Sequence, residues 1–246
     1  MATSGGRSMN AFVDGIRWLF DPENWPGPDG IAARLTEQVW LTVATVVITC
    51  LIAIPIGLWL GHAGKGGNLA INVSNVGRAV PVFAVLSILV LTPLRFSIWS
   101  TLIALVLFAI PPVLTNTYVG MREVDRDVVD AATGMGMNGT QLLRRVELPL
   151  AMPLLMNGVR LAAVQVVATA TIAALVAGPG LGRIITSGFR RQDLPQVIGG
   201  AILVALLALA VEGLMEFLQR RIDPLRRAGW VSSRQMPEAV DAVTGS

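Results

Sequence analysis

The sequence has little of what a soluble enzyme or a disulfide-bonded domain is built from. Its 246 residues include one cysteine, one histidine, one tyrosine and a single lysine, and only 14% of them are charged. Soluble domains carry about 25% charged residues. The lone Cys50 cannot form a disulfide within the chain, and one cysteine with one histidine argues against a zinc site. The net charge of +3 is too small to indicate a nucleic-acid partner.

Long apolar runs are what the sequence has in abundance. Hydrophobic residues make up 53% of the chain, which excludes intrinsic disorder. A helix needs about 20 mostly apolar residues to cross a bilayer, and its backbone must satisfy its own hydrogen bonds there. Five runs approach this length and predict an all-α polytopic membrane protein. These runs are residues 39–60, 79–93 with a lead-in from 69, 98–119, 158–177 and 195–217.

The ends of the chain are predicted to lie on opposite sides of the membrane, because five crossings are an odd number. Residues 9–20 have an apolar face but are too short to span, so the segment 1–37 is expected to include an interfacial helix. With the connection between the third and fourth runs in the cytoplasm, 12 of the 19 lysines and arginines lie inside, Arg160 among them. The positive-inside rule then predicts an outer N-terminus and a cytoplasmic tail, 218–246.

The connection 120–157 is too long for an ordinary loop, and such segments usually have a function. Its first part, 127–135, has helical spacing, and glycines follow that can end a helix. Prolines later redirect the chain towards the membrane. The spacing alone leaves two interpretations open, a rigid projection that inserts into another protein and a helical hairpin on the membrane surface. The residues expected on one narrow apolar face are Val128, Ala131, Ala132 and Met135.

The same connection resembles the signature loop of permease subunits of bacterial binding-protein-dependent ABC importers. The pattern requires an acid, two alanines, a glycine four residues after the second alanine, and an aliphatic residue, any residue and Leu-Pro further on. It is met by Asp130-Ala131-Ala132, Gly136, Val146 and Leu148-Pro149. Three more stretches are similar to the osmoprotectant branch, whose members import glycine betaine, choline or carnitine. They are RAVPVFAVLSIL at 78–89, PPVLTNTYVGMREVD at 111–125 and LVAGPGLGRII at 175–185.

This resemblance covers about residues 35–220 and implies a type I ABC importer permease fold. It implies about five transmembrane helices, a permease domain at 38–217 and a cytoplasmic coupling-helix loop at 120–157. The implied partners are a cytosolic ABC ATPase dimer, a second permease subunit (identical or homologous), an extracytoplasmic solute-binding protein and the lipid bilayer. The implied location is the cytoplasmic membrane of a bacterium.

The chain is expected to be a non-catalytic transport subunit, because it has no G-x-x-x-x-G-K-[ST] phosphate loop. By resemblance, ATP and Mg are bound by the partner ATPase and this chain binds no cofactor and no metal. The coupling loop would lie in a groove of that ATPase, where small residues allow close approach and methionines adapt to the surface. The candidate coupling residues are Asp130, Ala131, Ala132, Met135, Gly136, Met137, Leu148 and Pro149.

Polar residues in the runs are candidates for the translocation path, because polar groups at membrane depth are costly. Hydrogen bonds between helices are the alternative explanation for them. The turn after the fourth run is a further candidate, on resemblance to a gate-side turn of the family. The candidate path residues are Asn116, Thr117, Gln165, Thr169, Gly178, Pro179 and Gly180.

Charged residues are expected to be absent from the middle of the first four runs, while Glu212 and Glu216 lie near the inner end of the fifth. This sparseness suits a solute without net charge, such as a zwitterionic betaine. Three alternatives remain open, a permease for another small solute such as an amino acid, an ion-coupled secondary carrier and an intramembrane enzyme. A carrier would use the two glutamates for its coupling ion, and an enzyme would need clustered titratable residues.

Overall fold

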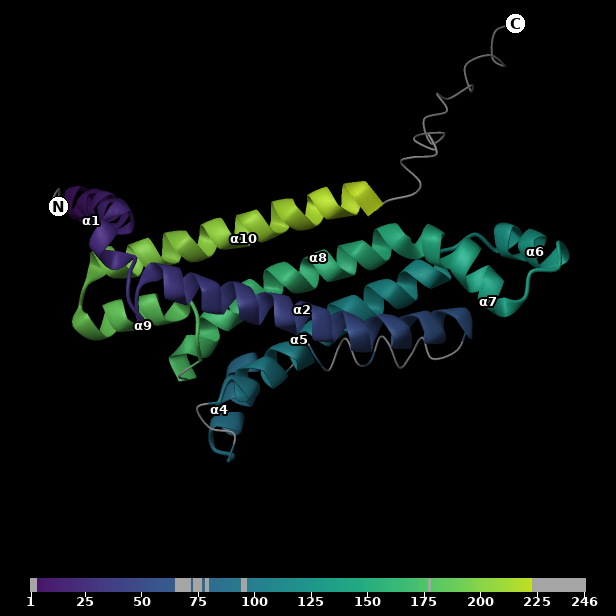
Figure 1. Ribbon diagram of the computed structural model, residues 1–246, viewed down its shortest axis with the longest axis horizontal. Helices are drawn as coiled ribbons and strands as arrows, with labels where there is room; N and C mark the ends of the chain where they lie inside the picture. The colour runs from purple at the N-terminus through teal and green to yellow at the C-terminus, as the bar shows by residue number, and fades with distance from the viewer. Residues whose placement is uncertain are drawn as a thin grey trace, which may run out of the picture.

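The computed structural model describes residues 4–64, 72, 77, 80–93, 97–176 and 178–222, and its regular elements are all helical (Figure 1). The α-helices are α1 (Ser4–Phe20), α2 (Ile31–His62), α4 (Val82–Val90), α5 (Ile98–Arg122), α6 (Arg126–Gly134), α7 (Gly139–Leu142), α8 (Leu148–Ala173), α9 (Gly182–Arg191) and α10 (Leu194–Ile222). Short 3-10 turns cover Pro22–Asn24 and Ala174–Val176, and a π-helical turn covers Leu143–Glu147.

Four helical segments are long and apolar enough to cross a membrane, namely Ile31–His62, Ile98–Arg122, Gly139–Val176 and Leu194–Ile222. They confirm four of the five predicted runs. The second run is described only in part, where α4 has nine residues. The rest of that run, like the tail beyond Ile222, lies outside the described residues, so the fifth crossing stays a prediction.

Close packing of small residues fixes the direction of the three central helices. Gly57 of α2 lies against Thr117 of α5, and Gly61 of α2 lies against Met121, so α2 and α5 run parallel. Gly158 of α8 lies against Asn116 of α5, while Gly120 lies against Ala151, so α8 runs antiparallel to α5. Glycines let backbones approach closely, as in other membrane bundles.

The parallel pair α2 and α5 has a consequence for the number of crossings. α2 ends and α5 ends at the same end of the bundle (Figure 1), so the chain that leaves Gly64 must return to the opposite end before α5 begins at Ile98. This topology supports the predicted fifth crossing.

An apolar core lies where α2, α5 and α8 meet, and α4 packs beside it through Leu86. The outer surfaces of the long helices remain apolar, which suits lipid or a second membrane subunit rather than water. Exposed large apolar side chains include Val43, Val47, Leu51 and Trp59 on α2 and Leu206, Leu209, Leu214 and Phe217 on α10.

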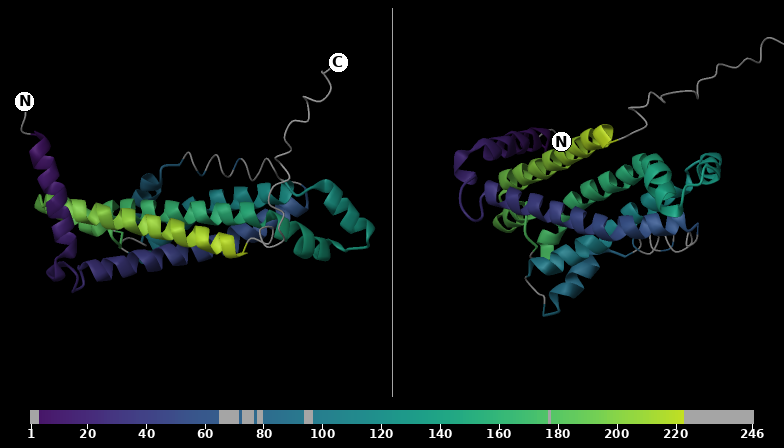
Figure 2. Two further views of the ribbon diagram at one scale, coloured as in Figure 1. Left: turned by 90° about the horizontal axis from the view of Figure 1, so that it is seen from above. Right: turned by 45° about the vertical axis from the view of Figure 1, so that its right-hand side comes forward.

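Helix α1 lies across the end of the bundle where α10 begins (Figure 2). Gly15 packs against Ile198, Trp18 packs against Gly199, and Leu19 is buried. Apolar side chains of α1 that remain exposed include Phe12, Val13, Ile16 and Phe20. Leu19 lies on the other side of the helix, which packs against α10.

Candidate functional site

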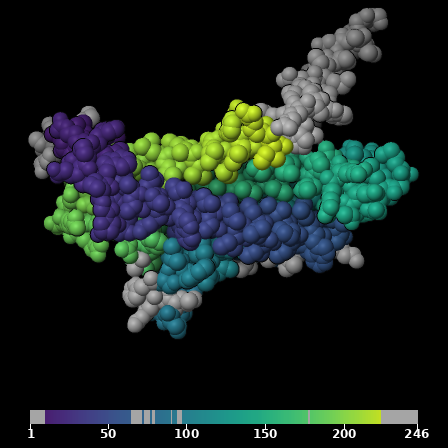
Figure 3. All heavy atoms as spheres, in the orientation of Figure 1, coloured from purple at the N-terminus to yellow at the C-terminus, as the bar shows by residue number. Residues whose placement is uncertain are grey.

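The connection between α5 and α8 projects beyond the other helices at one end of the bundle (Figure 3). Asp125 begins α6 by accepting a hydrogen bond from the N–H of Asp127 at 2.9 Å, a cap that also suits the helix dipole. The helix ends at Gly134, and Gly136 has a φ of 85°. The N–H of Gly136 donates to the carbonyl of Thr133 at 2.9 Å, and that of Met137 donates to Ala132 at 3.3 Å. Glycine takes this left-handed conformation readily, so the turn is sharp and defined.

A second cap fixes the short helix α7. The side chain of Asn138 accepts from the N–H of Gln141, and the side chain of Gln141 accepts from the N–H of Asn138, both at 3.0 Å. This reciprocal capping box satisfies two N–H groups that a helix start leaves free. The π-helical turn Leu143–Glu147 then continues directly into α8, so the projection is joined to that helix without a flexible linker.

The projection has its own small core. Val129, Ala132 and Leu142 pack against Met121 of α5 and Ala151 of α8. The core holds the projection against the ends of two spanning helices.

The predicted apolar face of α6 is wrong in one detail. Ala132 is 3% exposed and points inward beside Val129, whereas Val128 is 44% and Met135 74% exposed. The apolar arc of α6 is broad enough to have two halves, one buried in the projection and one facing away from the bundle. We call the outward set Val128, Ala131, Met135 and Gly136 the tip.

The remaining candidate coupling residues take intermediate positions. Asp130 is exposed on the flank of α6, and Met137, Leu148 and Pro149 are partly buried at the base of the projection.

A contact between a histidine and a carboxylate ties the projection to α2, and it is not among the contacts predicted from the sequence. His62, the last residue of α2, lies with Nδ1 2.5 Å from a carboxylate oxygen of Glu147. The Glu147 side chain is only 5% exposed. The two residues lie 85 positions apart, so no local pattern joins them; a lone histidine at the end of an apolar run was the available signal.

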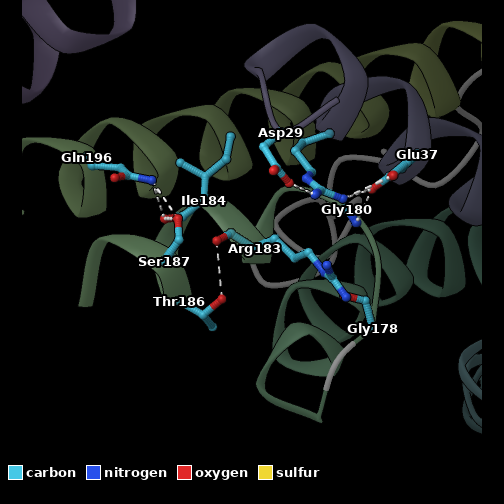
Figure 4. Close-up of polar contacts among 10 residues, drawn as sticks. Asp29, Glu37, Gly178, Gly180, Arg183, Ile184, Thr186, Ser187 and Gln196 are labelled. Atoms are coloured by element: carbon cyan, nitrogen blue, oxygen red, sulfur yellow. Dashed lines mark hydrogen bonds and ion pairs between the residues drawn. The ribbon is translucent and has the colours of Figure 1, made fainter. Parts of the chain in front are cut away.

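A second polar cluster lies at the opposite end of the bundle, around the turn 178–182 (Figure 4). The N–H of Gly180 donates to the Glu37 carboxylate at 2.9 Å, and the N–H of Leu181 donates to Gln38 Oε1 at 3.2 Å. Gln38 Nε2 in turn donates to the Val167 carbonyl of α8 at 3.1 Å. The start of α2 thus holds both the turn and the end of α8.

Two arginines complete this cluster. Arg34 forms ion pairs with Glu37, at 2.8 Å, and with Asp29. Arg183 donates through Nε to the carbonyl of Gly178 at 3.1 Å. The glycines of this turn were candidates from the sequence, whereas Glu37 and Gln38 were missed, because they precede the turn by 143 residues. Two polar residues at the start of an apolar run were the signal that could have found them.

The polar path candidates in the middle of the bundle separate into two groups. Thr117 is fully buried and Thr169 is 5% exposed, and the Thr169 hydroxyl donates to the Gln165 carbonyl of its own helix at 2.8 Å. Asn116 and Gln165 are partly exposed, and Asn157 of α8 donates to Asn116 Oδ1 at 3.5 Å. Thr117 and Thr169 therefore face the inside of this chain, and Asn116 and Gln165 lie at its surface.

A charged pair joins α8 to α10, contrary to the expectation of no charge in the middle of the first four runs. Arg160 Nη2 lies 2.7 Å from Glu212 Oε1. α8 begins at Leu148 rather than at 158, because helical residues of the projection continue into it. Arg160 therefore lies in the middle of α8 and not at its inner end.

Within the described part of the chain, no three His, Cys, Asp or Glu side chains come together as a metal site.

Comparison with known proteins shows which family has this sequence and fold. Residues 53–224 match the family described as binding-protein-dependent transport system inner membrane component. The carnitine transport permease protein OpuCB of Listeria monocytogenes is 35% identical over 188 residues, which are 76% of this chain and 86% of that protein. The osmoprotectant import permease protein OsmY of Salmonella typhimurium is 34% identical over 190 residues, 76% of this chain and 80% of that protein.

The fold agrees with this match. An inward-facing structure of the MetNI methionine ABC transporter superposes with a TM-score of 0.66 at 18% identity, covering 78% of this chain and 95% of that one. The described helices, their order and the projecting loop are thus those of a type I ABC importer permease. The chain belongs to the family of binding-protein-dependent transport system inner membrane components.

Proposed function

We propose that this chain is the permease subunit of an ATP-driven importer that moves a small osmoprotectant, such as glycine betaine, choline or carnitine, by alternating access. Family membership supports the transport role, and the names of the relatives support the solute class. The observation that carries the mechanism is the rigid projection, which exposes an apolar tip and is anchored to α2, α5 and α8.

The tip is the part of the chain that would receive energy from ATP. The sequence lacks a phosphate loop, so ATP and Mg would bind to a cytosolic ATPase dimer. Exposed Val128, Ala131 and Met135 offer a small apolar surface for a groove in that partner, with Asp130 at its edge. Since α8 continues from the projection without a break, a displacement of the tip moves α8 directly.

This assignment sets the orientation. The end with the projection faces the cytoplasm of a bacterial cell, and the end with α1 and the turn 178–182 faces outwards. The N-terminal segment 1–37 would then be extracytoplasmic and the tail 218–246 cytoplasmic. A second permease subunit, identical or homologous, would complete the path with 38–217 of this chain, and a solute-binding protein would deliver solute to the outer end.

Uptake by reconstituted vesicles tests the proposal. Vesicles would contain this chain with its ATPase and any second permease, enclose ATP, and receive binding protein and radiolabelled glycine betaine, choline or carnitine outside. We expect uptake of at least one solute that stops when ADP replaces ATP. Uptake driven by a proton or sodium gradient in vesicles without the ATPase would identify a secondary carrier instead.

A further inference from the structure

The ion pair between Arg160 and Glu212 lies away from both polar clusters at the ends of the bundle. The two side chains are 33% and 36% exposed. Charged groups at membrane depth are expensive, and they usually pair and face the interior of a bundle or a water-filled cavity. The core of this chain does not enclose this pair, so its environment must come from outside the single chain.

The position of the pair along the helices places it inside the long apolar helices and not at their ends. Gly158, two residues before Arg160, packs against Asn116 and the Pro112 carbonyl of α5, which precede the last residue of α5, Arg122, by 6 and 10 positions, or about 9 and 15 Å at 1.5 Å per residue. Glu212 precedes the last residue of α10, Ile222, by 10 positions, or about 15 Å. Helical residues therefore continue for several turns on both sides of the pair.

One further polar side chain of α8 lies beside the pair. Asn157 is exposed one turn before Arg160, whereas Leu161, the residue after Arg160, is apolar and 48% exposed. The opposite side of α8 is closed by buried Ala162 and Val166. We call Asn157 and Arg160 of α8 together with Glu212 of α10 the polar strip. Lipid against the polar strip would leave a charged pair and an amide without water, whereas a water-filled path would solvate them.

We propose that the polar strip is a transient binding site for a zwitterionic solute during its passage. The solute carboxylate would bind the guanidinium of Arg160, whose planar N–H groups match a carboxylate. A quaternary ammonium has no N–H to donate, and it would lie against the Glu212 carboxylate by charge attraction alone. Arg160 and Glu212, which now pair with each other, would each pair with the opposite charge of the solute instead, so no charge is left unpaired. This inference rests on the proposed import function.

The same chemistry predicts a preference among related solutes. Glycine betaine and carnitine have both charges, whereas choline has no carboxylate and would leave Arg160 unpaired. The site therefore favours zwitterions over a simple quaternary cation.

Direct binding tests the site apart from transport. The purified complex of this chain with its ATPase, in lipid nanodiscs and without solute-binding protein, would be titrated with radiolabelled glycine betaine and with choline. We expect Arg160→Gln to weaken betaine binding about ten-fold or more, the equivalent of losing one charge-assisted contact, with little effect on choline. Glu212→Gln should weaken both. Glu216→Gln is the matched control, because Glu216 lies one turn further along α10 and pairs with Arg220 of the same helix.

The exchanged pair Arg160→Glu with Glu212→Arg keeps an ion pair between α8 and α10 and guards against a folding defect in the single variants. Betaine binding within about two-fold of wild type by the exchanged pair supports the site. Equal betaine binding by Arg160→Gln and wild type overturns it. So does the absence of binding in a wild-type complex that still imports betaine with its binding protein, and that result leaves the proposed function intact. Binding without any ATP-driven uptake would instead refute the importer.

Discussion

Which residue type a position accepts depends on its backbone conformation and on how closely neighbouring atoms approach it. Glycine shows this most clearly, since Gly180 has a φ of 102° and the side-chain oxygen of Gln38 occupies the place where a β-carbon would lie. Gly136 also has a positive φ, of 85°, but nothing lies within 4 Å of the place where a side chain would begin. One glycine is required by backbone conformation and by packing, and the other by backbone conformation alone.

Gly180→Ala should therefore destabilise the protein more than the left-handed conformation alone explains. That conformation costs an L-residue about 1–2 kcal/mol, and displacement of Gln38 adds to it. We expect a lower midpoint of thermal unfolding in detergent, followed by tryptophan fluorescence. Gly134→Ala is the control, because this helical glycine has open space and an ordinary φ. A midpoint for Gly180→Ala equal to that of the control would contradict the close approach.

Gly136→Trp should prevent association with the ATPase while leaving membrane insertion unchanged. Its side chain would extend from the tip into any partner surface, whereas Gly136→Ala carries the same backbone strain of about 1–2 kcal/mol with almost no added bulk. Co-purification of the ATPase with the tagged permease measures the outcome. The tryptophan variant should lose the ATPase and the alanine variant should retain it. Recovery of the ATPase at wild-type yield with tryptophan in place would show that the tip is not the docking surface.

At the scale of the elements, α2 is held at both of its ends. Glu37 and Gln38 bind the turn 178–182 at one end, and His62 binds Glu147 of the projection at the other. Local patterns could predict the long helices, because an apolar run has little choice but to form one in a membrane. They could not predict these clamps, since each joins residues far apart in the sequence.

The extent of α8 shows a second limit of local patterns. The predicted run starts at 158, but the structure continues the helix back to Leu148 through residues that are apolar except for Asn157 and that include Pro149 and Pro153. The shift moves Arg160 from the start of the predicted run to the middle of the helix. The same reasoning chose Thr117 and Thr169 for the path by residue type alone. Which face of a helix is buried depends on its neighbours, and these two threonines face inward.

Gln38→Leu should loosen the turn 178–182. The N–H of Leu181 would lose its side-chain partner in a buried place, at a cost of about 1–3 kcal/mol for a group left unsatisfied. The Val167 carbonyl would also lose Gln38, but it still accepts from the Thr171 hydroxyl at 3.0 Å. Hydrogen exchange followed by mass spectrometry should show faster exchange in peptides covering 178–184. Thr36→Val is the matched control, because the Thr36 hydroxyl donates only to the Ala32 carbonyl of its own helix. Unchanged exchange in the Gln38 variant would mean that other contacts hold the turn.

Over the whole molecule, the two clamps and the continuous helix α8 connect the tip to the opposite end of the bundle. α8 runs from the projection to the turn 178–182, and α2 is fixed to both. α10 is joined to this unit through α9, through the pair Arg160–Glu212, and through Gln219, whose Nε2 donates to the Pro153 carbonyl of α8 at 3.3 Å. A displacement at the tip would therefore be shared by α2 and α8 and delivered to the turn.

Glu147→Leu tests this transmission, since it removes the inner clamp without touching the tip. The ATPase should still bind, because Val128, Ala131 and Met135 are unchanged. His62 would lose a charge-assisted contact of about 1.5–3 kcal/mol, so a displacement of the projection would move α2 by a smaller amount. The expected result in reconstituted vesicles is more ATP hydrolysed per solute imported, by about ten-fold or more if the full contact energy serves coupling.

Two further variants make that measurement specific. Glu123→Leu removes an exposed carboxylate close to the same end of the bundle, and it should leave the ratio of hydrolysis to uptake unchanged. Glu147→Gln keeps an acceptor for the His62 ring and should lie between wild type and the leucine variant. If the ratio of ATP hydrolysis to solute uptake is unchanged in Glu147→Leu while the ATPase is still bound, the contact with α2 is not needed for coupling. The displacement of the projection would then reach the bundle through α8 alone, because a second attachment of the projection would make no difference.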